Sequence, residues 1–262
     1  MKLSHTLVPA PLRAFFEENP RAALAFSGGV DSAFLLWAAT ACGADIRAYY
    51  VNSPFQPAFE LADAHRLTEE LGAAMTVLPL DVLQNENVTA NPPDRCYPCK
   101  QAIFSAILET AAADGYSLVA DGTNASDDAG DRPGMRALRE LSVRSPLREA
   151  GLTKNEIRAL SKEAGLFTWN KPSYACLATR IPTGRAIDAE TLAKIEAAED
   201  ALMTLGFTDF RVRVQLFGNA AKLQLPAGQL PTAVTRREEI VAALEPHFSD
   251  ILLDLRPRQG KD

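Results

Sequence analysis

A short turn between an apolar run and a helical pattern constrains the fold of this chain more than any other stretch. Residues 27–32 read Ser-Gly-Gly-Val-Asp-Ser, after the apolar residues 22–26 and before the helical pattern of residues 33–41. Glycine has no Cβ, so backbone N–H groups in the turn can approach a ligand closely, and the helix N-terminus adds partial positive charge. The turn therefore predicts an anion site between a strand and a helix.

The polar side chains of the turn fit the same interpretation. Ser27 and Ser32 supply hydroxyl donors, and Asp31 is placed either to cap the helix or to hold a metal ion that shares the anion. No Lys follows the glycines, so the turn is not the Lys-containing loop of P-loop NTPases. An ordinary capped turn is the alternative, but the position between strand and helix favours phosphate binding.

Composition narrows the class of protein. The chain has 262 residues, 47% of them hydrophobic, which is enough for one large domain or for an ordinary domain and a small one. No apolar run approaches the ~18 residues of a membrane span, and residues 1–20 lack the features of a signal peptide, so we expect a cytoplasmic protein. A net charge of −6 argues against a broad nucleic-acid surface. Four cysteines are too few for a disulfide scaffold.

Strand and helix patterns alternate along the first two thirds of the chain, which predicts a parallel sheet with helices on both faces. The strands are expected at 22–26, 46–51, 75–80 and 117–120, and the helices at 7–18, 32–42, 57–71, 101–113 and 153–165. A small α+β domain should follow, with helices at 189–205 and 236–244 and strands at 210–216, 221–225 and 251–255. We therefore predict domains at 1–184 and 185–262.

A second polar loop follows the strand expected at 117–120. Residues 121–124 read Asp-Gly-Thr-Asn, and loops at the carboxyl ends of strands form the ligand crevice of open α/β sheets. We expect this loop to face the turn at 27–32, although alone it would read as a surface turn. Arg132, Arg144 and Arg148 lie just beyond, and the sequence does not show which of them contacts phosphate.

Three cysteines lie in stretches that look irregular. Cys96 and Cys99 form a CxxC in an expected loop at 85–100, and Cys176 lies in residues 169–180, which fit neither helix nor strand well. A loop of that kind is either a domain connector or a site. Cys42 ends an apolar helix pattern and reads as a core thiol.

The turn resembles the PP-loop of the N-type ATP pyrophosphatases, which split ATP into AMP and pyrophosphate. The resemblance implies that the turn holds the leaving pyrophosphate, that Mg²⁺ held by Asp31 neutralises it, and that residues 122–124 line the ATP. The ATP-binding residues it assigns are Ser27, Gly28, Gly29, Asp31, Ser32, Gly122, Thr123 and Asn124.

Five segments in order resemble the LarE family of ATP-dependent sulfur transferases, which build the nickel-pincer nucleotide cofactor. They read SGGVDS, NPPDRCYPCK, DGTNASDD, KPSYACLATR and FRVRV. The resemblance implies that ATP adenylates a carboxylate of pyridinium-3,5-biscarboxylic acid mononucleotide and that a protein-held sulfur displaces AMP to give a thiocarboxylate. Two carboxylates are converted in turn. A thiolate or sulfide is the competent nucleophile for such an activated carboxylate near neutral pH.

The resemblance also assigns residues to the substrate. Cys176 occupies the position that supplies sulfur in some members, and Arg180 and Glu199 match residues lining the substrate site. Arg211 and Arg213 alternate on an expected strand, so they share a face and can clamp a nucleotide phosphate. Without the family match, a solvated edge strand would be an equal interpretation.

In other members three cysteines hold a 4Fe–4S cluster, and the resemblance extends to Cys96, Cys99 and Cys176. Three thiolates leave one iron open to carry a sulfide. We favour this route over a sacrificial one, in which Cys176 gives up its sulfur and becomes dehydroalanine. A three-cysteine zinc site and a disulfide within the CxxC are less favoured.

Two other functions remain open at this point. One is a PP-loop tRNA thiolation enzyme, against which the acidic charge and the lack of a basic run speak. The other is an ATP-binding, zinc-stapled module without catalysis. We expect a homo-oligomer that binds neither nucleic acid nor membrane. The sequence does not identify the sulfur donor.

Overall fold

The computed structural model describes residues 4–127 and 133–259. The chain divides into two compact units, and each contains segments that are distant in sequence. The first unit comprises Met1–Ser53, Ala58–Leu80 and Cys96–Lys171, and the second Pro54–Pro57, Asp81–Arg95 and Pro172–Asp262. Both this division and the sequence-based one keep residues 185–262 together. The domain boundary at residue 184 stays a prediction.

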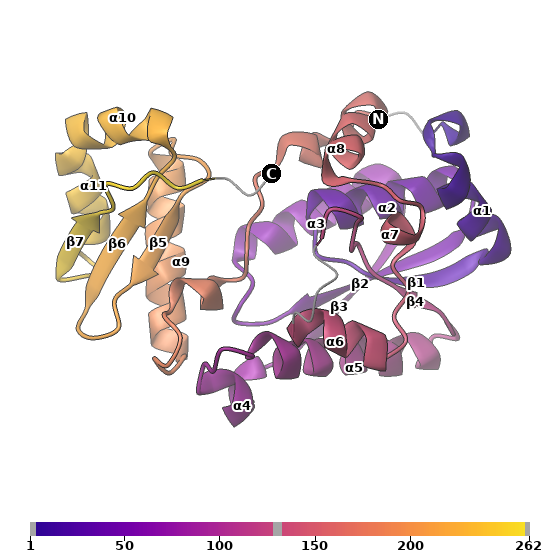
Figure 1. Ribbon diagram of the computed structural model, residues 1–262, viewed down its shortest axis with the longest axis horizontal. Helices are drawn as coiled ribbons and strands as arrows, with labels where there is room; N and C mark the ends of the chain where they lie inside the picture. The colour runs from indigo at the N-terminus through magenta and orange to yellow at the C-terminus, as the bar shows by residue number, and fades with distance from the viewer. Residues whose placement is uncertain (1–3, 128–132, 260–262) are drawn as a thin grey trace. The chain divides into compact units, whose positions relative to one another are not determined.

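A four-stranded parallel sheet forms the centre of the first unit, as the alternating pattern predicted. Its spatial order is β3-β2-β1-β4 (Figure 1). The strands are β1 (Arg21–Ala25), β2 (Asp45–Asn52), β3 (Ala74–Pro79) and β4 (Val119–Ala120). The helices of this unit are α1 (Ala10–Glu18), α2 (Val30–Ala41), α3 (Ala58–Leu71), α5 (Cys96–Ala113), α6 (Pro133–Glu140), α7 (Pro146–Glu149) and α8 (Lys154–Ala164).

Helices cover both faces of this sheet, and the strand sequences show why. Alternate residues of a strand point to opposite faces, so a strand buried on both sides must be apolar throughout. Ala22 and Leu24 of β1 pack into one apolar cluster with α1, α2 and α8, whereas Ala23 packs into another with α5. Figure 1 shows α5 on one face and α1, α2 and α8 on the other. The predicted layer arrangement is confirmed.

The loop expected at 85–100 is wrong near both ends, because the short helix α4 occupies Glu86–Thr89 and α5 begins at Cys96. Pro98 suggested a loop, but it lies in the first turn of α5. The N–H groups of a first turn have no intrahelical partner, so proline costs little there. Cys96 and Cys99 are therefore three residues apart on one helix face.

The second unit is the predicted small α+β fold. Its sheet has the order β5-β6-β7, with β5 and β6 antiparallel and β6 and β7 parallel. The strands are β5 (Arg211–Val214), β6 (Ala220–Gln224) and β7 (Asp250–Leu253), and the helices are α4 (Glu86–Thr89), α9 (Ala189–Thr204), α10 (Leu230–Thr235) and α11 (Arg237–Leu244). The sequence did not predict α4 or α10, nor α6 and α7 of the first unit.

Asn91 joins the segment Asp81–Arg95 to the rest of the second unit. Its side chain is fully buried, and its amide donates to the carbonyl oxygens of Pro182 at 2.9 Å and Arg185 at 3.0 Å. Gly184 N–H donates back to the Asn91 carbonyl at 3.0 Å. The polar residues of this segment thus complete the second unit.

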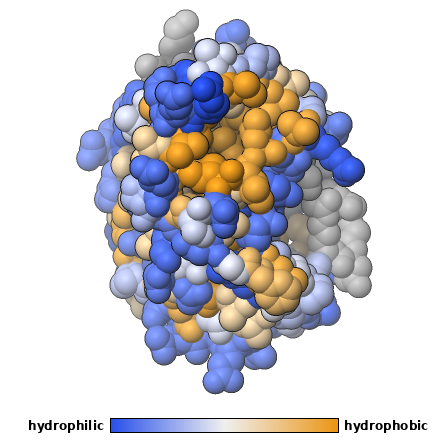
Figure 2. Space-filling view, turned by 90° about the vertical axis from the view of Figure 1, so that its left-hand side faces the viewer, coloured by the Kyte–Doolittle hydropathy of each residue, from blue (hydrophilic) through white to orange (hydrophobic). Residues whose placement is uncertain are grey.

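The large exposed apolar side chains of the described residues all belong to the second unit. They are Leu216, Phe217, Val234, Val241, Leu252 and Leu255. Figure 2 shows a contiguous apolar area with polar atoms around it. Within residues 4–127 and 133–259, no helix is long and apolar enough to span a bilayer.

Candidate active site

The turn at residues 27–32 joins β1 to α2 and is built from short polar contacts. Gly28 has a φ of +71°, a left-handed conformation that glycine adopts without strain. The Ser27 and Ser32 hydroxyl oxygens lie 3.1 Å apart, and Ser32 Oγ accepts a hydrogen bond from Ser27 N–H at 3.3 Å. Ser27 is exposed and Ser32 is buried, so the turn presents one hydroxyl outward and fixes it with the other.

Asp31 lies in the first turn of α2, but it does not cap the helix. Gly29 is the N-cap residue, and it has no side chain that could accept hydrogen bonds from the unpaired N–H groups of the first turn. The alternative prediction, that Asp31 caps the helix, is therefore wrong. Lys154 Nζ binds Asp31 Oδ2 at 2.6 Å, whereas Asp31 Oδ1 is buried without a hydrogen-bond partner among the described residues. Burial raises the pKa of Asp31 above its ordinary value, and Lys154 opposes this only in part.

The unpaired Oδ1 of Asp31 fits the Mg²⁺ that the family implies. A carboxylate oxygen beside a phosphate-binding turn is a ligand that Mg²⁺ prefers, and a buried oxygen without a partner is costly unless a cation binds it. The role of Asp31 as a Mg²⁺ ligand stays a prediction.

A second lysine lies beside the same turn. Lys171 Nζ contacts Glu60 Oε2 and Asp63 Oδ2, each at 2.7 Å, and the Gly28 carbonyl at 3.5 Å. Burial raises the pKa of Glu60, although Lys171 opposes the shift. The contacts of Lys171 hold α3 and the turn together.

The loop at residues 121–124 packs directly against the turn. A Cβ built on Gly122 would lie 2.9 Å from the backbone nitrogen of Ser32, so only glycine fits there without movement. Asp121 fixes the loop by accepting hydrogen bonds from Thr123 N–H at 3.2 Å and Ser145 Oγ at 2.7 Å. The structure thus brings together the two segments that the sequence assigned to ATP.

We expect Gly122→Ala to impair ATP binding and to lower the free energy of unfolding by about 1–3 kcal/mol, because its Cβ would displace the backbone of Ser32. Urea unfolding and an ATP titration measure the two effects. Gly151→Ala is a poor control, because Gly151 has a φ of +71°. Gly228→Ala suits better, because a Cβ there meets no atom within 4 Å. If Gly122→Ala bound ATP like Gly228→Ala, the close approach would have no role.

The three arginines that follow the loop differ. Arg144 pairs with Glu149 at 2.5 Å. Arg148 donates to the carbonyl oxygens of Asn124 and Asp127, so it holds the loop. Arg132 lies outside the described residues.

In the second unit, a buried ion pair holds the segment that carries Cys176. Arg180 and Glu199 have side-chain exposures of 0% and 1%, and their two hydrogen bonds measure 2.9 and 3.0 Å. Arg180 Nη1 also donates to the carbonyl of Ala175 at 2.5 Å. Tyr174 donates its hydroxyl to Glu199. The pair positions residues 174–176, and its direct contact with substrate stays a prediction.

Arg211 and Arg213 on β5 also bind this segment. Arg211 Nη2 donates to the Ser173 carbonyl, and Arg213 Nη1 donates to the Thr179 carbonyl at 2.6 Å. Burial, with the charges of Arg180 and Arg258, lowers the pKa of Arg211 to about 10. The same causes lower the pKa of Arg213. This excess of positive charge favours an anion beside β5.

We expect Arg180→Met to lower the free energy of unfolding by roughly 3–5 kcal/mol, because Glu199 would remain buried without its counter-ion. Chemical denaturation measures the loss. The double variant Arg180→Met with Glu199→Leu should recover much of the stability, because it removes both charges. A single variant as stable as the wild type would contradict the structural importance of this pair.

The cysteines are distributed over both units. Cys96 is exposed and Cys99 half-buried at the start of α5 in the first unit, whereas Cys176 is half-buried in the second. Cys42 was expected to be a core thiol, but it is only half-buried: it caps the C-terminus of α2 and packs against the edge of the main apolar cluster. Within residues 4–127 and 133–259, no three His, Cys, Asp or Glu side chains gather to hold a metal ion. The cluster therefore stays a prediction, and we derive no chemical step through it.

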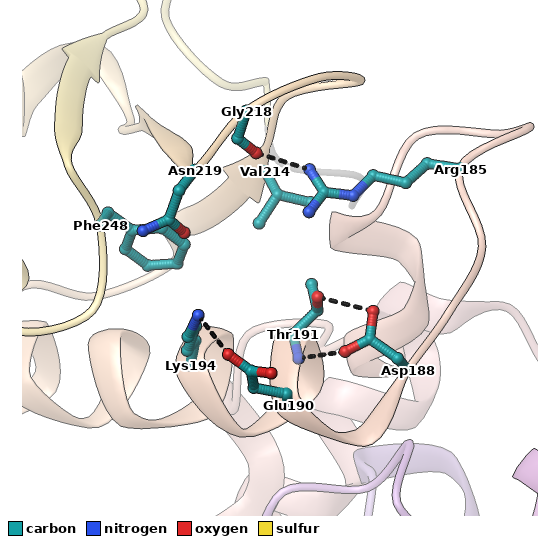
Figure 3. A pocket seen from close by; sticks show the side chains of 9 residues that line it. All are labelled: Arg185, Asp188, Glu190, Thr191, Lys194, Val214, Gly218, Asn219 and Phe248. Carbon is teal, nitrogen blue, oxygen red and sulfur yellow. Dashed lines mark hydrogen bonds and ion pairs between the residues drawn. The ribbon is translucent and has the colours of Figure 1, made fainter.

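A cavity of about 420 Å³ lies in the second unit, and no cysteine lines it (Figure 3). Its charged side chains already have partners: Lys194 binds Glu190 at 2.7 Å, and Arg185 donates to the Gly218 carbonyl at 3.3 Å. No buried unpartnered side-chain atom of the described residues belongs to it. We assign it no ligand.

Sequence reasoning missed Lys154, Lys171 and Glu60. Lys154 lies at the start of the helix expected at 153–165, and Lys171 within the segment KPSYACLATR, but neither received a role. Lys154 is 123 residues from Asp31, and Lys171 is 111 residues from Glu60, so no local pattern links them. The one available signal was that the turn at 27–32 has no lysine of its own, so a cationic partner could be expected from elsewhere in the chain.

A parallel sheet whose first strand ends in the Ser-Gly-Gly-Val-Asp-Ser turn is the α/β fold expected of a PP-loop ATP pyrophosphatase. No protein-family model matches the chain. It is 34% identical over 249 residues to the pyridinium-3,5-bisthiocarboxylic acid mononucleotide synthase of Lactiplantibacillus plantarum, which covers 94% of this chain and 90% of that protein. The chain belongs to the LarE family of sulfur transferases.

Two further relatives are uncharacterized proteins. One, from Synechocystis sp., is 39% identical over 220 residues, covering 84% of this chain and 81% of the relative. The other, from Methanocaldococcus jannaschii, is 28% identical over 239 residues, covering 91% and 90%. The similarity therefore extends over both compact units.

Proposed function

We propose that this protein is an ATP-dependent sulfur transferase that converts the carboxylates of pyridinium-3,5-biscarboxylic acid mononucleotide to thiocarboxylates, with release of AMP and pyrophosphate. Membership of the LarE family supports the substrate. The observation that carries the ATP chemistry is the unpaired, buried Oδ1 of Asp31 beside a turn whose backbone suits phosphate.

Activation of the substrate uses the first unit. A carboxylate oxygen of the substrate attacks the α-phosphorus of ATP, and the bond to the β-phosphate oxygen breaks. The turn at 27–32 then binds the departing pyrophosphate through its N–H and hydroxyl groups, which are already oriented before ATP arrives. Mg²⁺ held by Asp31 would supply positive charge to the leaving group.

Sulfur transfer uses Cys176. In the sacrificial route its thiolate attacks the adenylated carboxyl carbon, AMP leaves, and a thioester joins protein and substrate. Loss of the Cys176 α-proton to a base then breaks the Cβ–S bond, which leaves dehydroalanine in the protein and a thiocarboxylate on the substrate. In the alternative that the sequence favours, Cys96, Cys99 and Cys176 would hold a 4Fe–4S cluster, which would supply an external sulfide in place of the Cys176 sulfur.

Arg211 and Arg213 are our candidates for binding the nucleotide phosphate of the substrate. They lie on one face of β5 within a positively charged region of the second unit, whereas the turn for ATP belongs to the first. Arg180 pairs with Glu199 and donates to the Ala175 carbonyl, so this pair holds the segment that carries Cys176.

We expect Arg211→Ala and Arg213→Ala to weaken substrate binding about tenfold or more, while ATP affinity changes little, because each removes a charged partner of the substrate phosphate. Separate calorimetric titrations with ATP and with the pyridinium mononucleotide measure both affinities. Arg237→Ala, which removes an exposed arginine of α11, is the matched control. Equal losses of ATP and substrate affinity would refute this assignment.

A turnover count tests the proposed function. Protein, Mg-ATP and the pyridinium dicarboxylate are incubated anaerobically, and thiocarboxylate per subunit, AMP, pyrophosphate and protein mass are measured. AMP and pyrophosphate together with thiocarboxylate support the proposal, whereas ADP and phosphate exclude it. One sulfur per subunit with loss of hydrogen sulfide from the protein indicates the sacrificial route.

The apolar area of the second unit supports the predicted homo-oligomer, because large exposed apolar areas commonly mark protein interfaces (Figure 2). A cytoplasmic location also stays a prediction.

A further inference from the structure

The ion pair between Lys154 and Asp31 involves one of the two carboxylate oxygens of Asp31. Lys154 Nζ lies 2.6 Å from Oδ2, and the two side chains are 15% and 21% exposed. Asp31 Oδ1 is buried and has no hydrogen-bond partner among the described residues. A structural salt bridge that is largely removed from water would normally satisfy both oxygens. The Lys154 ammonium therefore occupies Oδ2, while Oδ1 remains available to bind a cation.

The start of α8 holds the backbone of Lys154 in place. Thr153 and Glu156 form a reciprocal capping box, and Lys154 N–H donates to Ser126 Oγ at 2.9 Å. The backbone of Lys154 is thus fixed while its side chain keeps rotatable bonds, and among residues 4–127 and 133–259 its carboxylate partner is Asp31. Lys171 differs, because two carboxylates and the Gly28 carbonyl hold its ammonium.

We propose that Lys154 is an internal counter-ion that occupies the cation position at Asp31 until Mg²⁺ binds, and that its ammonium then binds the polyphosphate. The proposal rests on the proposed use of Mg-ATP. A divalent ion binds a carboxylate more strongly than an ammonium does, so it displaces Lys154 from Oδ2 and also satisfies Oδ1. The turn has no lysine of its own, and Lys154 supplies one from another helix.

The competition is measured without ATP, by titrating Mn²⁺ into metal-free protein at pH 8 and following free Mn²⁺ by electron paramagnetic resonance. Lys154→Met should bind Mn²⁺ about tenfold more tightly than the wild type, because the competing cation is gone. Lys154→Gln provides a second, polar replacement if the methionine variant folds poorly. Lys162→Met makes the same change at an exposed position of α8 and should match the wild type. Adding Asp31→Asn to Lys154→Met should abolish the tight binding.

A second titration follows ATP in the presence of EDTA. Here Lys154→Met should bind ATP about tenfold more weakly than Lys162→Met, because the polyphosphate loses its ammonium partner. Equal or weaker Mn²⁺ binding by both Lys154 variants would overturn the proposal, and so would an absence of measurable Mn²⁺ binding to any of the proteins. ATP binding that is unchanged by Lys154→Met would overturn the transfer to phosphate. The Mn²⁺ result does not depend on turnover, so failure of pyrophosphate release would refute only the proposed function.

Discussion

Cys176→Ala is expected to abolish thiocarboxylate formation while the protein stays folded and still releases pyrophosphate from ATP and substrate. Both sulfur routes need the Cys176 sulfur, as nucleophile in one and as cluster ligand in the other. The contacts that hold the segment use the backbone carbonyls of Ala175 and Cys176 with Arg180, and alanine keeps them. Chromatography of the pyridinium product and a pyrophosphate assay measure the two steps.

The other cysteines separate the two routes. Under the cluster route, anaerobic protein should be brown with about four irons per subunit, and Cys96→Ala or Cys99→Ala should remove both iron and sulfur transfer. Under the sacrificial route, those variants should each still complete one turnover. Cys42→Ala is the control, because Cys42 packs against the core of the first unit. Repeated turnover by Cys176→Ala would contradict both routes.

Asp31→Asn is expected to reduce ATP cleavage to background, because an amide is a far weaker metal ligand than a carboxylate and the turn would lose its metal. Ser27→Ala should change ATP cleavage in the same direction, because it removes an exposed hydroxyl from the turn proposed to bind pyrophosphate. A coupled pyrophosphate assay at saturating Mg-ATP measures both. Asp45→Asn is the matched control, because Asp45 lies at the amino end of β2 and pairs with Arg21 on the surface.

Although Asp31→Asn should lose ATP cleavage, its thermal stability should not fall at neutral pH. Because burial raises the pKa of Asp31 in the folded protein, the folded state holds its proton to higher pH than the unfolded state does. Ionisation thus costs folding stability as pH rises from the ordinary aspartate range through the raised pKa, and the cost persists at neutral pH. At pH 7, metal-free Asp31→Asn should have a melting temperature equal to or above that of the wild type. At pH 3, its melting temperature should be at most slightly below that of the wild type. Lower thermal stability at pH 7 would show that the Lys154 pair outweighs burial.

The core of the first unit could be predicted because its signals are local. Strands buried on both faces are apolar throughout, and the Thr153–Glu156 capping box marks the start of α8 within four residues. The CxxC misled the prediction, because proline disfavours a helix interior but is tolerated in a first turn. The short helix α10 has too few residues for a periodic pattern to emerge.

The site could be predicted only where its chemistry is contiguous. The turn at 27–32 holds its glycines, hydroxyls and carboxylate in six consecutive residues, so the pattern itself indicated phosphate. Lys154 reaches Asp31 only through tertiary structure. Arg180 and Glu199 were expected to line the substrate site because they match residues of the family there, and their mutual pairing left no mark in the sequence.

The division into two units determines which unit can be completed first while the chain is synthesised from its N-terminus. The chain passes between the units after residues 53, 57, 80, 95 and 171, so the first unit has all its residues once Lys171 is synthesised. Asn91 is made long before Pro182 and Arg185, whose carbonyls satisfy its amide. Until they emerge, the buried Asn91 amide lacks these two acceptors, so the segment Asp81–Arg95 cannot reach its final hydrogen bonding before the C-terminal part of the second unit is made. A truncation at residue 184 would leave that segment permanently incomplete.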